Sequence, residues 1–434
     1  MLKACLFLAV LPVWLSAGSA QACAPLAPAD AAALSLAAVQ ARVPDCHPDV
    51  LAARAGLGGA VADVQVAGQR PNPQLTLGAG SVGRELGSGA LWDKTFDHSV
   101  RLDQLIERGG KPGLRQGSAQ AALQAANADL AEASRRAVQA VSHAHLDLWS
   151  AQGRVTQLTA AAALGVESLR AMDRRVQAGD APALDATRLR LDDARLQADL
   201  RQARADVIDF QHALAWLIGA PDQAGHMLAL LPDAGRWTAP TADAADPTHG
   251  ASRRADVVAA QARVAAAELA RDLAAAARTR DVSVGVQFDR WPTSPANGSG
   301  TGNTLSLSLS VPLFVRHGYE GERARAEADL AAARVALARA ESNAASELAR
   351  AESRAVAASD RRKLVAEQLE PAAERVAAGA EIAYQRGATG ALEWLDARRS
   401  LRAVRLERIA ADAELAKALA DWQASATPLD AVKP

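Results

Sequence analysis

The residues of this chain that could carry chemistry are its cysteines and one pair of closely spaced histidines. Cys23 and Cys46 could form a disulfide that closes a short N-terminal loop. His143 and His145 could suggest a metal, but side chains two positions apart on a helix point in different directions, so one ion could not easily use both. No phosphate-binding glycine loop, nucleophile elbow or zinc signature occurs. The residues therefore predict no catalytic constellation, no cofactor site and no metal site.

The first 22 residues have the pattern of a secretory signal peptide. Lys3 gives a positive start, residues 4–15 are apolar, and small residues lead to cleavage after Ala20 or Ala22. This segment is too short to remain in a membrane. The mature chain is therefore expected to be exported.

Three fates are open to the two cysteines that remain after cleavage. An oxidising compartment favours a disulfide between Cys23 and Cys46. Lipidation of Cys23 is the rival, although such signals usually place an aliphatic residue three positions before the cysteine and a small one two before it, where this chain has Ala20 and Gln21. Two free thiols are the third alternative.

The composition excludes several classes of protein. The 434 residues include 48 Lys and Arg against 49 Asp and Glu, and this balance argues against a basic nucleic-acid surface. The chain is 50% hydrophobic but only 3% aromatic, because much of its apolar half is alanine. Such a composition favours long, closely packed helices over a conventional enzyme core. No internal apolar run approaches the roughly 18 residues of a membrane helix.

The chain contains two copies of one long unit. Residues 49–53 (DVLAA) and 256–260 (DVVAA) are 207 positions apart, and Gly179 and Gly387 are 208 apart. The predicted organisation is a first repeat at 23–219, a connector at 220–250, a second repeat at 251–424 and a tail at 425–434.

Each repeat is predicted to contain two strands, because apolar residues alternate with small or polar ones. The strands lie near 74–81 and 97–105 in the first repeat, and near 281–289 and 304–312 in the second. One apolar and one polar face fit a transmembrane β-barrel segment. Four strands cannot close a barrel, and open edges leave backbone groups unsatisfied in lipid, so several chains must contribute strands. A soluble sheet packed on a helix is the alternative.

Long helix pairs are predicted at 113–219 and 319–424, each repeat beginning with a shorter helix. Small and aliphatic residues such as Leu123, Leu130 and Ala137 recur every seven positions, which indicates a coiled-coil-like seam. The first of these helices would extend on the order of 100 Å. Because it is longer than a bilayer is thick and has charged faces, it is expected in the aqueous periplasm.

In this order, the elements resemble the TolC family of outer-membrane efflux channels, and within it the CzcC-like branch of heavy-metal exporters. The motifs that carry the resemblance are 70–75 (RPNPQL), 107–111 (ERGGK), 311–314 (VPLF), 384–387 (YQRG) and 392–398 (LEWLDAR). The resemblance implies a mainly α fold with a small β part, located in the outer membrane of a Gram-negative bacterium. A homotrimer would form a twelve-stranded barrel from four transmembrane strands per protomer, above a periplasmic α-barrel of coiled-coil helices.

The resemblance also implies a function without catalysis. The chain would be the passive outer-membrane channel of a tripartite RND-type efflux system, with a periplasmic adaptor, an inner-membrane pump and outer-membrane lipid as partners, and no nucleic acid. Heavy-metal cations are the expected cargo. Export of organic compounds or drugs is one alternative, and a periplasmic coiled-coil interaction protein is an alternative of another class.

The resemblance assigns roles to residues at the periplasmic end. Two helix-turn-helix tips would receive the adaptor, and their residues are Gly179, Leu184, Gly387 and Leu392. Glycine suits such turns because it tolerates positive φ.

A gate is implied at the same end. Glu393 and Asp396 would form a ring of six carboxylates in a trimer, which attracts cations. Tyr384 and Asp185 match a gate-closing link, although Thr389 stands where the best-known member has an arginine. Asp185 could instead be a favourable charge at a helix N-terminus, and Tyr384 could be a packing residue. Trp394 is expected to be a packing anchor.

Overall fold

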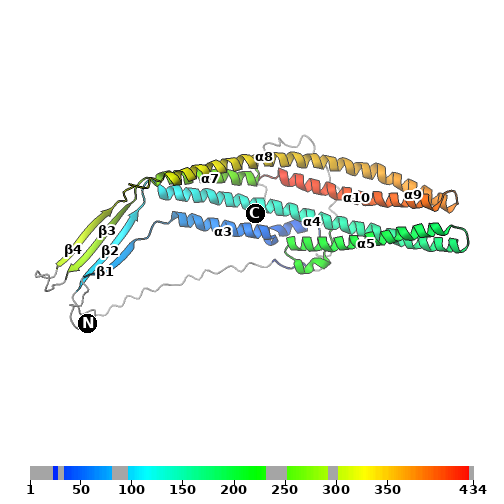
Figure 1. The fold of residues 1–434 in the computed structure, drawn as a ribbon, viewed down its shortest axis with the longest axis horizontal. Coiled ribbons are helices and arrows are strands. Elements are labelled where there is room, and N and C mark those ends of the chain that lie inside the picture. The colour runs from blue at the N-terminus through cyan, green and yellow to red at the C-terminus, as the bar shows by residue number, and fades with distance from the viewer. Residues whose placement is uncertain (1–22, 28–33, 81–95, 231–251, 292–301, 430–434) are drawn as a thin grey trace, which may run out of the picture.

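The computed structural model describes residues 23–27, 34–80, 96–230, 252–291 and 302–429, which form a long rod with a small sheet at one end (Figure 1). The first half contains α2 (Leu36–Cys46), α3 (Pro48–Gly68), β1 (Gln74–Gly80), β2 (Asp97–Ile106), α4 (Lys111–Gln177), α5 (Ala183–Leu217) and the 3-10 helix η3 (Pro221–His226). The second half contains α7 (Ala255–Ala276), β3 (Val282–Trp291), β4 (Gly302–Ser310), α8 (Glu320–Leu364), the π-helical turn η5 (Val365–Leu369), α9 (Glu370–Gln385) and α10 (Ala391–Ala426).

The four strands form one antiparallel sheet in the order β1-β2-β3-β4, and each lies within two residues of its predicted position. The register aligns Leu75, Leu102, Val286 and Leu307 in one row across the sheet. Between 42% and 79% of each of these residues is exposed. The apolar face is therefore uncovered by the described chain, whereas a soluble sheet would bury it against a helix.

The seven-residue seams lie inside the helical rod. In α4 the buried seam positions include Leu130, Ala137 and Leu158, and in α8 they include Leu330 and Ala344. Alanine at these positions lets neighbouring helix backbones approach closely. α4 is continuous over 67 residues, as the sequence predicts.

The long helix of the second half is interrupted, whereas the sequence predicts a continuous helix. η5 separates α8 from α9, and Pro371 lies at the start of α9. Proline has no backbone N–H, and its ring clashes with the carbonyl four residues earlier, here that of Glu367. A π-helical turn relieves such a clash by adding a residue to the turn.

The predicted N-terminal helix is also divided, at His47, whose backbone is extended because Pro48 follows it. Contrary to our expectation, Leu36–Gly68 is long and apolar enough to cross a membrane by length and composition. This segment is apolar because it contains few charged residues, and much of it is alanine and glycine, which have small side chains. The break at His47 and the packing of α3 along α4 give it the form of a surface helix pair instead.

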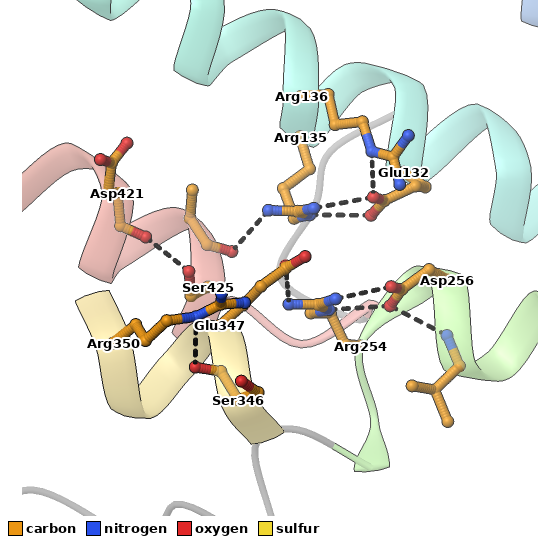
Figure 2. Close-up of polar contacts among 12 residues, drawn as sticks. Glu132, Arg135, Arg136, Arg254, Asp256, Ser346, Glu347, Arg350, Asp421 and Ser425 are labelled. Atoms are coloured by element: carbon orange, nitrogen blue, oxygen red, sulfur yellow. Dashed lines mark hydrogen bonds and ion pairs between the residues drawn. The ribbon is translucent and has the colours of Figure 1, made fainter. Parts of the chain in front are cut away.

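A buried ion-pair network joins the helices near the middle of the rod (Figure 2). Arg254, which is 1% exposed, donates to Asp256 at 2.6 and 2.8 Å and to Glu347 of α8 at 2.8 Å. Burial alone would lower the pKa of Arg254, but the two carboxylates raise it above its usual value. The guanidinium therefore stays charged and ties the start of α7 to α8.

A second arginine beside this network joins α4 to α10. Arg135 donates to both oxygens of Glu132 at 2.7 Å and to the backbone carbonyl of Ala424 at 3.4 Å. Nearby, Asp421 of α10 accepts from Gln139 of α4 at 2.7 Å. These contacts connect helices from both halves of the chain at one level of the rod.

We expect Asp256→Asn to lower the free energy of unfolding by about 3 kcal/mol, because it leaves a buried guanidinium without its main partner. Urea denaturation of the detergent-solubilised protein, followed by circular dichroism, measures the loss. Asp129→Asn, which removes an exposed ion pair with Arg263, is the matched control and should change stability by less than about 1 kcal/mol.

The Arg254–Asp256 ion pair should also make the free energy of unfolding depend on pH. Burial would raise the pKa of Asp256, but Arg254 outweighs this effect and lowers it below the usual carboxyl value. The stabilisation is therefore complete above the unfolded pKa of about 4 and is lost as the pH falls through the lower folded pKa. The difference between wild type and Asp256→Asn should shrink over that acidic range; a difference that stays constant there would contradict this assignment.

Candidate functional site

Two helical turns lie at the end of the rod opposite the sheet, one between α4 and α5 and one between α9 and α10 (Figure 1). Gly179 and Gly387 have φ of 80° and 73°. In each turn the glycine N–H donates to the carbonyl three residues earlier at 3.1 Å, and the next N–H donates to the carbonyl five residues earlier at 2.8 Å. This is the Schellman arrangement, which requires a left-handed residue. Glycine is required here by the positive φ and not by lack of space, since a Cβ at either position would meet no atom within 4 Å.

Each turn presents an exposed leucine at the equivalent place in its repeat. Leu184 is in the first turn of α5, and Leu392 is in the first turn of α10. Neither side chain is part of the apolar cluster beneath the tips. The two leucines therefore form a pair of exposed apolar contacts at the end of the molecule.

The cluster beneath the tips is built around Trp394, which is 4% exposed and acts as the expected packing anchor. The other buried members are Met172, Ala186, Leu189, Ala391 and Leu395. Tyr384 stacks on Trp394, with ring centroids 4.9 Å apart, and the indole N–H donates to Glu381.

Two arginines enclose the Tyr384–Trp394 pair. The guanidinium carbon of Arg175 lies 5.1 Å from the Tyr384 ring centroid, and that of Arg398 lies 4.8 Å from the Trp394 ring centroid. Arg398 also donates to the hydroxyl of Ser168 at 2.6 Å, and burial lowers the pKa of its guanidinium. This stack of cations and aromatic rings joins the tip of α4 to those of α9 and α10. The role of these two arginines was not predicted from the sequence.

Glu393 and Asp396 are exposed and lie one turn apart on α10, on the side away from buried Trp394. Asp396 is 61% exposed and lies 3.4 Å from Arg399, which also binds the less exposed Asp192 at 2.8 Å. Because Arg399 is shared and the contact to Asp396 is exposed, this pairing is weak. The structure therefore presents two carboxylates together to solvent at the tip.

The predicted link between Tyr384 and Asp185 stays a prediction. Asp185 lies 3.4 Å from Arg188 in the first turn of α5, where its charge suits the helix N-terminus. Tyr384 packs on Trp394. The hydroxyl oxygen of Thr389 is buried and has no hydrogen-bond partner in the described part of the chain.

Cys23 and Cys46 are joined by a disulfide in the structure, with their Cα atoms 5.3 Å apart. Gly219, with φ of 68°, packs against this disulfide, and a Cβ there would lie 3.2 Å from both cysteine Cβ atoms. Gln223 donates to and accepts from the backbone of Leu26. The N-terminal segment is thus fixed to the end of α5.

The two histidines that raised the question of a metal have separate partners. His143 Nε2 lies 2.6 Å from Asp421, and His145 Nε2 lies 2.8 Å from the Leu34 carbonyl. Burial lowers the pKa of His145, which favours its neutral form. Within the described ranges, no three His, Cys, Asp or Glu residues come together in a group that could hold a metal.

Solved structures share this fold along almost the whole chain. CusC is 17% identical, with a TM-score of 0.77 and coverage of 91% of this chain and 92% of that one. The outer-membrane channel OprN is 21% identical, with a TM-score of 0.74 and coverage of 91% and 90%. The outer membrane protein VceC from Vibrio cholerae is 19% identical, with a TM-score of 0.74 and coverage of 91% and 96%. None of the curated protein sequences compared with this chain matches it.

The outer membrane efflux protein family matches the sequence twice, at residues 44–220 and again at 250–425. These two matches confirm that the chain is duplicated, and they confirm the resemblance to TolC-like channels. The heavy-metal branch stays a prediction. Because the two matches together span most of the chain, the chain belongs to the outer membrane efflux protein family, whose members are non-enzymatic channels of the outer membrane.

Proposed function

We propose that the chain is the outer-membrane channel of a tripartite efflux system and works as a homotrimer. The observation that carries this proposal is the uncovered apolar face of the sheet, together with the two edge strands β1 and β4. In lipid, the backbone groups of both edges need partners. Pairing β4 of one protomer with β1 of the next satisfies them, and three protomers then form a twelve-stranded barrel.

The helical rod would then extend through the periplasm toward an adaptor and an inner-membrane RND pump. The two tips support this role, since they combine rigid turns with the exposed side chains of Leu184 and Leu392. If the chain is instead a periplasmic interaction protein, sucrose-gradient fractionation will recover it in the soluble fraction. Recovery there would overturn the channel proposal.

Replacing Gly179 and Gly387 with leucine should reduce export while the protein stays in the membrane. Leucine at positive φ is strained by roughly 1–2 kcal/mol at each turn, and its side chain would project from the tip. Export is measured as resistance of cells to the cargo. Gly379→Leu in α9 is the control, because that position has open space and no positive φ. Full resistance in the double variant would show that the adaptor does not dock at the tips.

Glu393→Gln with Asp396→Asn should raise single-channel conductance or weaken cation selectivity in planar bilayers. These changes remove the carboxylates of the proposed ring and keep the side-chain shapes. Asp329→Asn, at an exposed acid on α8, serves as the control. Single-channel behaviour identical to that of the wild type would count against a gate at these residues.

Heavy-metal cations are the proposed cargo, supported by the CzcC-like motifs and by the exposed acids of the tip. A deletion strain challenged separately with zinc, cobalt, nickel, cadmium and copper should accumulate at least one of these ions, measured as cellular metal content. If the strain accumulates no metal but becomes sensitive to organic compounds, the channel exports such compounds, and only the metal assignment is wrong.

A further inference from the structure

The face of the sheet opposite the apolar row carries a polar network with a fixed register. Its central residues are Arg101 and Asp103 of β2, Gly285, Gln287 and Asp289 of β3, and Ser306 and Ser308 of β4. Arg101 is aligned with Gln287, and Asp103 is aligned with Gly285. Neighbouring strands therefore bring these side chains together on one surface.

The guanidinium of Arg101 is held by groups from three strands. It donates to both oxygens of Asp103 at 2.6 and 2.8 Å, to the hydroxyl of Ser308 at 3.2 Å and to Gln287 at 3.4 Å. Gly285 provides the space, since a Cβ there would lie 2.4 Å from an Asp103 oxygen. A bidentate pair fixes both the position and the charge of an arginine. Arg101 is thus neutralised where it stands.

The remaining charge on this face is negative. Asp289 accepts from the amide of Gln287 at 2.8 Å, which is a neutral donor, and no basic side chain of the described strands pairs with it. Arg101 is the only basic residue on the polar face of the described strands. At the centre of this face in the described strands, the carboxylates of Asp103 and Asp289 against the one guanidinium of Arg101 leave a formal charge of −1 per chain.

We propose that Asp289, with the Arg101–Asp103 pair, makes the strand portion of the channel selective for small hydrated cations. This inference rests on the proposed function, because the polar face lines the pore only if the strands form a barrel. Three copies of Asp289 then form one ring of negative charge, which attracts cations and repels anions. The ion pair keeps Arg101 from offsetting that ring.

The test compares the ion selectivity of variants that remove either Asp103 or Arg101 from the ion pair. Reversal potentials are measured in planar bilayers under a potassium chloride gradient, with the full-length protein carrying Glu393→Gln and Asp396→Asn so that the tip acids do not contribute. Asp289→Asn should lower the preference for potassium over chloride by about twofold. Asp103→Asn leaves the charge of Arg101 without its partner and should also lower the preference for potassium. Arg101→Gln leaves the charge of Asp103 without its partner and should raise the preference for potassium.

The opposite signs separate selectivity from structure. A pair with a structural role alone would give changes in the same direction for Asp103→Asn and Arg101→Gln, and this result would overturn the proposal. Arg101→Lys keeps the positive charge and should leave the potassium-to-chloride preference of the parent protein unchanged. Normal channels with unchanged selectivity in Asp289→Asn would also overturn the proposal. If the parent protein forms no channel at all, the proposed function itself falls, which is a distinct result.

Discussion

The backbone of the sheet edges is the constraint on which the rest of the structure depends. β1 and β4 each have one side without a partner in the described chain, and their outer face is apolar. A bilayer can accept that face only if both edges are paired. The proposed trimer follows from this requirement, and the helices that continue from the strands must then surround one axis. Alanine in the buried seams suits this arrangement because it allows helices to pack closely.

Duplication places equivalent residues at equivalent points, yet the two copies have diverged in chemistry. His47 and Arg254 are 207 positions apart, and both are buried caps at the start of a helix. His47 accepts from the backbone N–H of Asp49, and burial lowers the pKa of its imidazole. Arg254 instead keeps its charge between Asp256 and Glu347. One copy thus has a weakly basic cap, and the other has the centre of an ion-pair network.

Local patterns in the sequence were enough to predict the strands and the long helices. The period of two located all four strands, and the period of seven located the buried seam. Both breaks in the helices follow from Pro48 and Pro371. Both prolines can be seen in the sequence, but the helical pattern around each of them predicted a continuous helix. The stack of Arg175 and Arg398 on the tip aromatics could not be predicted, because it joins three helices whose packing no local pattern specifies.

The net charge of −1 conceals where charge acts in this molecule. Buried charges in the middle of the rod are paired, as Arg254 is, and contribute to stability. Carboxylates in excess over their partners lie at the tip and on the polar face of the sheet. In series, the narrower of two charged rings dominates selectivity, because an ion passes closer to its charges. In the proposed channel, a closed tip would therefore set selectivity at Glu393 and Asp396, and if an adaptor opened the tip, Asp289 in the strands would become the ring that ions meet at close range.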